Sequence, residues 1–170
     1  MIASAFLLMM AQAAAEPIEL SCTLELEVQP LRAVSVTDER ERRFSGAEVL
    51  AMLTDEDREA FALESGSETA FPFLLTVEPE SGEGRIRFER DFEGSYYGGE
   101  SAWVSAEVLP DRIAVDLNAD EPFMISRRNG RISGSYELDL EAGSVADPSQ
   151  TAVLAAGGSC ERITAEDRIF

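Results

Sequence analysis

Five stretches between residues 71 and 140 alternate apolar and polar residues, and this alternation constrains the fold more than any other feature of the chain. "GRIRFERDF" sets Ile86 and Phe88 against Arg85 and Arg87, and "GRISGSYELDL" repeats the pattern over residues 130–140. Successive side chains on a strand point to opposite faces, so a period of two predicts antiparallel strands with one apolar and one wet face.

The segments between these stretches are rich in turn-forming residues. "PESGEG" (79–84) and "LPDR" (109–112) suit hairpin loops, and Asn129-Gly130 suits a type I′ turn. Because no helical pattern separates the strands, the sequence predicts an antiparallel β-meander from 71 to 140, curled into a barrel-like or sandwich sheet. The expected fold class is mainly β (α+β).

A short helical segment is expected near residues 45–63. Ser45, with Glu48 three residues later, forms a capping-box pattern, and Thr54 followed by acids marks a second helix start. We expect two short helices, or one bent helix, that cap an open end of the sheet or cover a face.

The first fifteen residues, "MIASAFLLMMAQAAA", are uncharged and end in small residues. This pattern predicts a secretory signal peptide over 1–15, although its start lacks Lys and Arg. The apolar run is too short to cross a bilayer, which takes about 20 residues. We therefore expect one β-rich domain over 16–170, without a transmembrane segment, exported to the periplasm or secreted.

Export determines how the two cysteines are interpreted. Cys22 lies on the apolar side of an alternating stretch, "IELSCTLELEV", and Cys160 stands near the other end of the chain. Thiols are oxidised outside the cytosol, so a structural Cys22–Cys160 disulfide is expected. The alternative is a reactive thiol pair, which neither a CxxC spacing nor a neighbouring histidine or lysine supports.

The chain has 33 acidic residues, 14 basic residues that are all arginine, and a net charge of −19. Such a charge argues against nucleic acid as a partner, because phosphate binding needs a concentrated positive surface. It favours a basic protein or an envelope component as partner, or an acidic surface that only maintains solubility. The sequence leaves the oligomeric state open.

The absence of histidine and lysine excludes the usual Ser-His-Asp, Cys-His and Schiff-base chemistries. No cofactor-binding motif is present, so no cofactor is expected. Asp116, Asn118 and Asp120 space their oxygens like the start of a calcium loop, but the glycine and the distal acid of such a loop are missing. The alternative is a strand end followed by an Asn/Asp turn.

Two further groups are candidate binding residues. Tyr96, Tyr97 and Trp103 surround a Gly-Gly loop, and they form either an exposed platform or part of a second small core. Arg127, Arg128 and Arg131 flank the Asn-Gly turn, and they form either an anion contact or a solvated hairpin tip.

The leader, Cys22, the hairpin "FMISRRNGRISGSYEL" (123–138) and the late "GGSCE" together resemble small exported β-rich proteobacterial proteins with one disulfide, whose function is unknown. This resemblance implies location and β character. The acidity, the disulfide and "GSYYGGESAW" are similar to bacterial lysozyme inhibitors, which are small β-barrels that block a cationic enzyme. The Ser-Gly-x-x-Tyr loop of that family is not matched, so no residue is carried over.

These observations favour a non-enzymatic exported module that binds a protein or a small ligand. One alternative is an inhibitor of a basic secreted enzyme such as lysozyme, which the negative charge would attract. The other is a carboxylate-dependent hydrolase of envelope glycans, for which no acid pair stands out.

Overall fold

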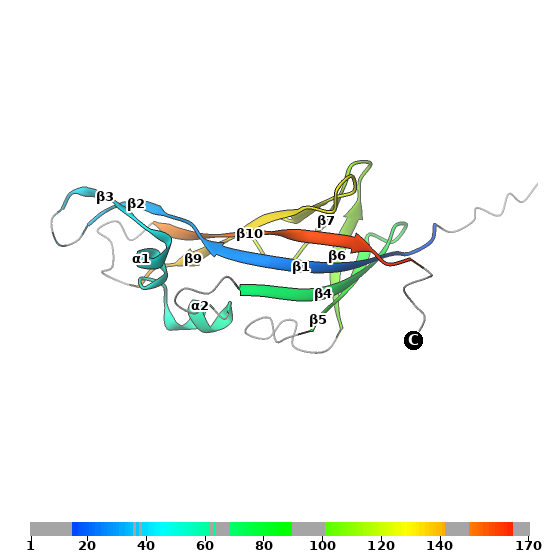
Figure 1. Ribbon diagram of the computed structural model, residues 1–170, viewed down its shortest axis with the longest axis horizontal. Coiled ribbons are helices and arrows are strands. Elements are labelled where there is room, and N and C mark those ends of the chain that lie inside the picture. The colour runs from blue at the N-terminus through cyan, green and yellow to red at the C-terminus, as the bar shows by residue number, and fades with distance from the viewer. Residues whose placement is uncertain are drawn as a thin grey trace, which may run out of the picture.

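The computed structural model describes residues 15–35, 37, 39–61, 63, 69–89, 101–141 and 150–164, so the expected signal segment lies almost entirely outside it. Eight strands close into an antiparallel barrel in the order β1-β10-β9-β8-β7-β6-β5-β4 (Figure 1). They are β1 (Ile18–Val28), β4 (Thr69–Glu78), β5 (Glu83–Phe88), β6 (Ala102–Val108), β7 (Arg112–Val115), β8 (Phe123–Ser126), β9 (Ile132–Asp139) and β10 (Thr151–Arg162). The mainly β, barrel-like fold predicted from the alternation is confirmed.

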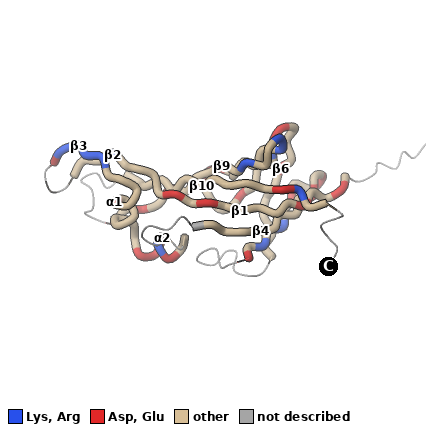
Figure 2. The backbone as a smooth tube through the Cα atoms, viewed as in Figure 1, with Lys and Arg blue, Asp and Glu red and all other residues tan. Residues whose placement is uncertain are grey.

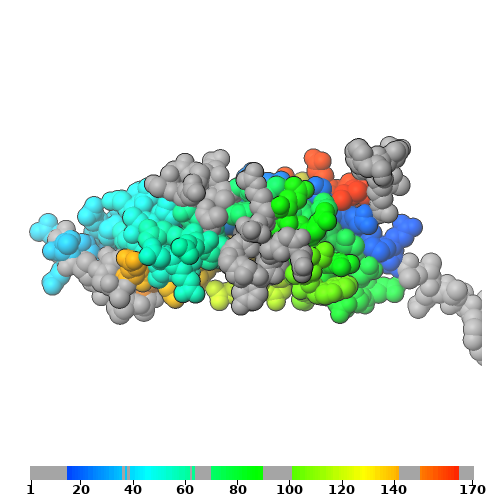
Figure 3. Space-filling model, turned by 90° about the horizontal axis from the view of Figure 1, so that it is seen from below, coloured from blue at the N-terminus to red at the C-terminus, as the bar shows by residue number. Residues whose placement is uncertain are grey.

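Because neighbouring strands run antiparallel, successive connections lie at alternate ends of the barrel. The turns 79–82, 109–111 and 127–131 lie at one end, beside the start of β1 and the end of β10, and we call this the hairpin end. The connection from β1 to β4 lies at the opposite end and contains β2 (Leu31–Val34), β3 (Glu41–Phe44), α1 (Gly46–Leu50) and α2 (Asp55–Ala60). The molecule is elongated, with this helical end at the left of Figures 1 and 3.

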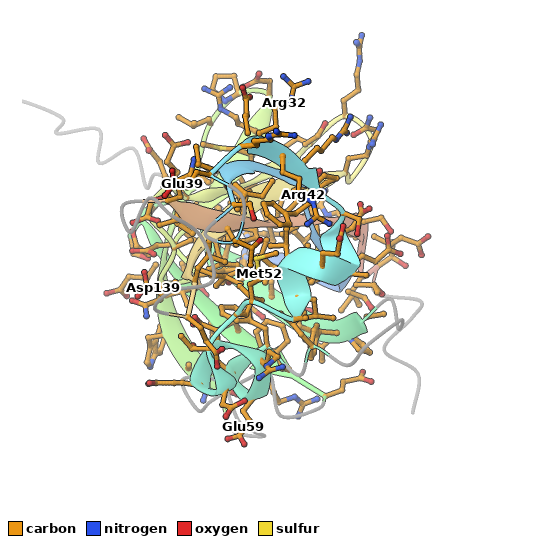
Figure 4. All side chains as sticks on the ribbon, turned by 90° about the vertical axis from the view of Figure 1, so that its left-hand side faces the viewer. Arg32, Glu39, Arg42, Met52, Glu59 and Asp139 are labelled. Carbon is orange, nitrogen blue, oxygen red and sulfur yellow. A yellow bond between two sulfur atoms is a disulfide. The ribbon has the colours of Figure 1, made fainter. Side chains whose placement is uncertain are left out.

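Two short helices lie at the helical end, which Figure 4 views directly. The predicted capping box is present: Ser45 caps α1, and its backbone N–H donates to Glu48 Oε2 at 2.9 Å. This bond, followed by the Ser45 hydroxyl, lowers the pKa of Glu48. After α1, Leu53 is fully buried and forms a bridge with Leu140, so the segment is fastened to the end of β9. The helices therefore cap one end of the barrel, as the sequence suggested.

The large aromatic side chains of the core occupy the middle of the barrel and its helical end. The ring of Tyr136 lies 5.2 Å from the ring of Phe123 on β8, measured between centroids. It lies 4.8 Å from the ring of Phe61, which follows α2. Gly134 provides the space, since a Cβ there would lie 2.6 Å from the Phe123 ring. The buried hydroxyl of Tyr136 donates to Leu117 O at 3.3 Å and ties β9 to the 116–122 connection. Aromatic side chains thus fill this end of the barrel.

The hairpin at 127–131 is confirmed, but its predicted type I′ geometry is wrong. A type I′ turn needs positive φ at both central residues, and only Gly130 has it, at +69°. Ser126 N–H donates to Arg131 O, so four residues form the loop instead of two. The longer loop reaches the neighbouring turn, because Arg127 N–H donates to Asp111 O at 2.9 Å.

Candidate functional site

A pocket of about 650 Å³ opens at the hairpin end of the barrel. It lies between the start of β1, the end of β10, the 79–82 and 127–131 turns, and the strand ends of β6 and β7. Its lining consists of Ala15, Glu16, Ile18, Leu20, Pro79, Val108, Ile113, Ile125, Ser126, Arg127, Arg128, Asn129, Gly130, Cys160 and Arg162. This volume lies within the range of sites for small molecules, which is about 300–1,000 Å³.

The inner wall of the pocket is apolar. Leu20, Ile113 and Ile125 point inward from three different strands, and each is at most 8% exposed. These medium-sized aliphatic side chains replace the aromatic rings found deeper in the barrel. The interior is therefore less completely filled at this end, which leaves room for an apolar group.

The rim of the pocket is basic, in contrast to the whole chain. Arginines contribute three lining residues and acids only one, whereas acids outnumber basic residues 33 to 14 in the sequence. Arg127 Nη1 donates to Leu109 O at 2.9 Å, so this side chain holds two hairpin turns together. The backbone N–H of Arg128 donates to Ser126 Oγ at 3.3 Å, but within the described part of the chain the side chains of Arg128 and Arg162 make no ion pair or hydrogen bond.

The disulfide forms part of the pocket wall. Cys22 and Cys160 are paired directly across β1 and β10, and the bond between them confirms the predicted bridge. Cys160 N–H also donates to Gly130 O at 2.8 Å, which fixes the 127–131 turn against β10. The covalent link and the rim turn are thus connected through one residue.

The structure separates the three arginines that the sequence grouped together. Arg127 and Arg128 line the pocket, whereas Arg131 lies in a shallow groove on the outer surface, with Asp111, Met124 and Ser133. Sequence reasoning missed Arg162, although the signal was available. It stands two residues after the inward-facing Cys160, and residues two apart on a strand share a face.

Trp103 lies on the outer face of β6 with 66% of its surface exposed, so it is not part of a second core. It is paired across the strands with Arg85, whose guanidinium carbon lies 5.7 Å from the ring centroid. Such a contact is typical of a cation–π interaction. Tyr96 and Tyr97 lie outside the described residues, so the proposed aromatic platform has one described member.

The weak calcium candidate has the features of an Asn/Asp turn. Asp116 Oδ1 accepts from Asn118 N–H at 2.9 Å, and Asn118 has a positive φ of +61°. Asp116, Asn118 and Asp120 are all exposed. Within the described ranges, no group of three or more His, Cys, Asp or Glu side chains is placed to hold a metal ion.

An acidic face covers the adjacent strands β1, β10 and β9 on the outside of the barrel. Figure 2 shows acidic positions along β1 and at the end of β10. Small residues such as Thr23, Ser135 and Gly157 lie between the acids, so this part of the sheet has few bulky side chains. The exposed acids of this face are Glu25, Glu27, Glu137, Asp139 and Glu161.

Comparison of the chain with protein-family models, with curated proteins and with solved structures finds no match. Of the helices in the described residues, none has both the length and the apolar character needed to cross a membrane.

Proposed function

We propose that this protein is an exported, non-enzymatic binding module that takes up a small ligand with an apolar part at the hairpin end of its barrel. The observation that carries the proposal is the 650 Å³ pocket with an apolar wall and a polar rim. Small-molecule sites typically combine a mostly apolar cavity with a few polar groups that orient the ligand.

Export is proposed on two grounds. The leader sequence has the pattern of a signal peptide. The Cys22–Cys160 bridge joins the first and last strands of the barrel, and such structural disulfides persist in oxidising compartments. The chain's lack of histidine and lysine, together with the pocket's single acidic side chain, supports binding over catalysis.

Filling the pocket tests the proposal. We expect Val108→Phe to weaken the binding of twelve-carbon amphiphiles, dodecanol and dodecanoate, by roughly tenfold or more, because the ring occupies space that the ligand needs. Isothermal titration calorimetry measures the affinity. The matched control is Val153→Phe, since Val153 is 39% exposed on the outside of β10. Equal affinities of both variants and the unsubstituted protein would contradict a site in the barrel.

The acidic face supports a second candidate, inhibition of a basic secreted enzyme. Carboxylates gathered on one side of the barrel would steer a cationic partner toward that side, and this attraction weakens with salt. No residue of the pocket takes part in this role.

We expect inhibition of a lysozyme-type enzyme at low salt that weakens at high salt. The double variant Glu25→Gln/Glu27→Gln should inhibit the enzyme less than the unsubstituted protein does, because it removes two of the five exposed carboxylates of the acidic face. Glu83→Gln/Glu89→Gln on β5 and just beyond it, outside that face, is the charge-matched control. An enzyme assay that shows no inhibition at either salt concentration rules this candidate out.

A further inference from the structure

The charge of the pocket rim points to the chemical class of the ligand. We infer that the ligand is an amphiphile with an anionic head group, such as a carboxylate or a phosphate, which Arg128 and Arg162 bind at the mouth of the pocket. This inference rests on the proposed function and adds the identity of the head group to it.

The first argument is that the two guanidinium groups are available. Arg127 is already engaged with Leu109 O, whereas Arg128 and Arg162 make no side-chain hydrogen bond or ion pair within the described ranges. Both line the same pocket, from the 127–131 turn and from the end of β10. Two like charges at one mouth repel each other, and a bound anion would remove that repulsion.

The second argument is geometric. The apolar wall made by Leu20, Ile113 and Ile125 lies inside the barrel, and the arginines lie at its rim. A ligand that satisfies both parts has an apolar portion that enters the barrel and a charged group that stays near water. The planar guanidinium of arginine presents a fixed fork of N–H donors. This fork matches the paired oxygens of a carboxylate or a phosphate better than the ammonium group of a lysine side chain does.

The third argument comes from the surrounding charge. A protein of net charge −19 repels anions over a Debye length of about 10 Å at 0.1 M salt. The mouth of the pocket presents three arginines and one glutamate, so its charge is opposite in sign to the net charge of the chain. This local reversal favours selection of an anion over a cation or a neutral head.

Three ligands that share a twelve-carbon tail but differ in the charge of the head group test the inference. The protein is the unsubstituted, oxidised full chain. Dodecanoate, dodecanol and dodecyltrimethylammonium are titrated by calorimetry at about 0.15 M salt, where long-range repulsion is screened beyond ~8 Å. We expect dodecanoate to bind roughly tenfold more tightly than dodecanol, as suits partly exposed charge pairs, and the cation to bind most weakly.

Arginine variants then locate the head group. Arg128→Gln/Arg162→Gln should lose this tenfold preference for dodecanoate while leaving dodecanol binding within about twofold. Arg131→Gln, on the same turn but on the outer surface, should leave both affinities unchanged. Saturable binding with equal affinity for all three heads overturns the head-group inference and leaves the proposed function standing. If none of the three ligands binds, both are overturned.

Discussion

Replacing both cysteines by alanine is expected to lower the free energy of unfolding by about 5 kcal/mol. Cys22 and Cys160 are separated by 138 residues, so their bond closes a loop that contains nearly the whole barrel. Without the bond, the unfolded chain gains the entropy of an open chain of this length, and the folded barrel keeps its β1–β10 hydrogen bonds. A loss of this size is comparable to the total stability of many small domains.

Urea denaturation of the Cys22→Ala/Cys160→Ala variant measures this loss. The slope of free energy against urea should also rise, because an unfolded chain without the bridge exposes more surface. Reduced protein with both thiols intact is the control that separates the missing bond from the missing sulfur atoms. A loss below 1 kcal/mol would show that strand pairing alone closes the barrel.

Gly130→Ala is expected to destabilise the protein by about 3 kcal/mol or more, although it adds a single methyl group. The added Cβ would lie 2.0 Å from Cys160 O, and Gly130 also has a positive φ of +69°. The carbonyl cannot easily move away, since Cys160 is held by the disulfide and by its hydrogen bond to the same turn. The turn must therefore shift off β10, which also alters the rim of the pocket.

Gly82→Ala separates the two causes. Gly82 has nearly the same φ, +70°, but nothing lies within 4 Å of a Cβ there. The Gly82→Ala variant should therefore be destabilised only by its positive φ, by roughly 1–2 kcal/mol. Its melting temperature should fall much less than that of Gly130→Ala. Equal losses in both variants would mean that the contact between the 127–131 turn and β10 has no energetic weight.

Much of the fold could be predicted because local contrast along the strands was strong. β1, β5 and β9 alternate charged or polar residues with large apolar ones. The sequence therefore predicts which side chains point into the barrel and which point to solvent. β10 was missed as a strand because "TAVLAAGGSCER" alternates mainly between small and apolar residues, which gives little contrast. β3, "ERRF", is short and has a single buried residue. β10 pairs with both β1 and β9 and so closes the barrel. Closure therefore could not be predicted from the local pattern of any single strand.

The pocket could not be predicted for a different reason. The alternation assigns Leu20, Ile113 and Ile125 to the inner face of the sheet. Whether a cavity remains between them depends on how side chains from separate strands pack together, which the sequence does not give. Two of the three rim arginines, Arg127 and Arg128, are predicted from the sequence as candidates for an anion contact, and Arg162 is not. Arg131 was grouped with them by its position in the sequence, whereas the four-residue turn places it on the outer surface.

A titration of the oxidised full chain with dodecanoate, followed by methyl NMR, tests the central claim most directly. The account predicts saturable binding at a single site, with the largest shifts at the methyl groups of Leu20, Ile113 and Ile125 inside the hairpin end. The exposed methyl groups of Val153 on the outer surface should not shift. Absence of saturation, or shifts confined to the outer surface around Val153, would contradict a ligand site within the barrel.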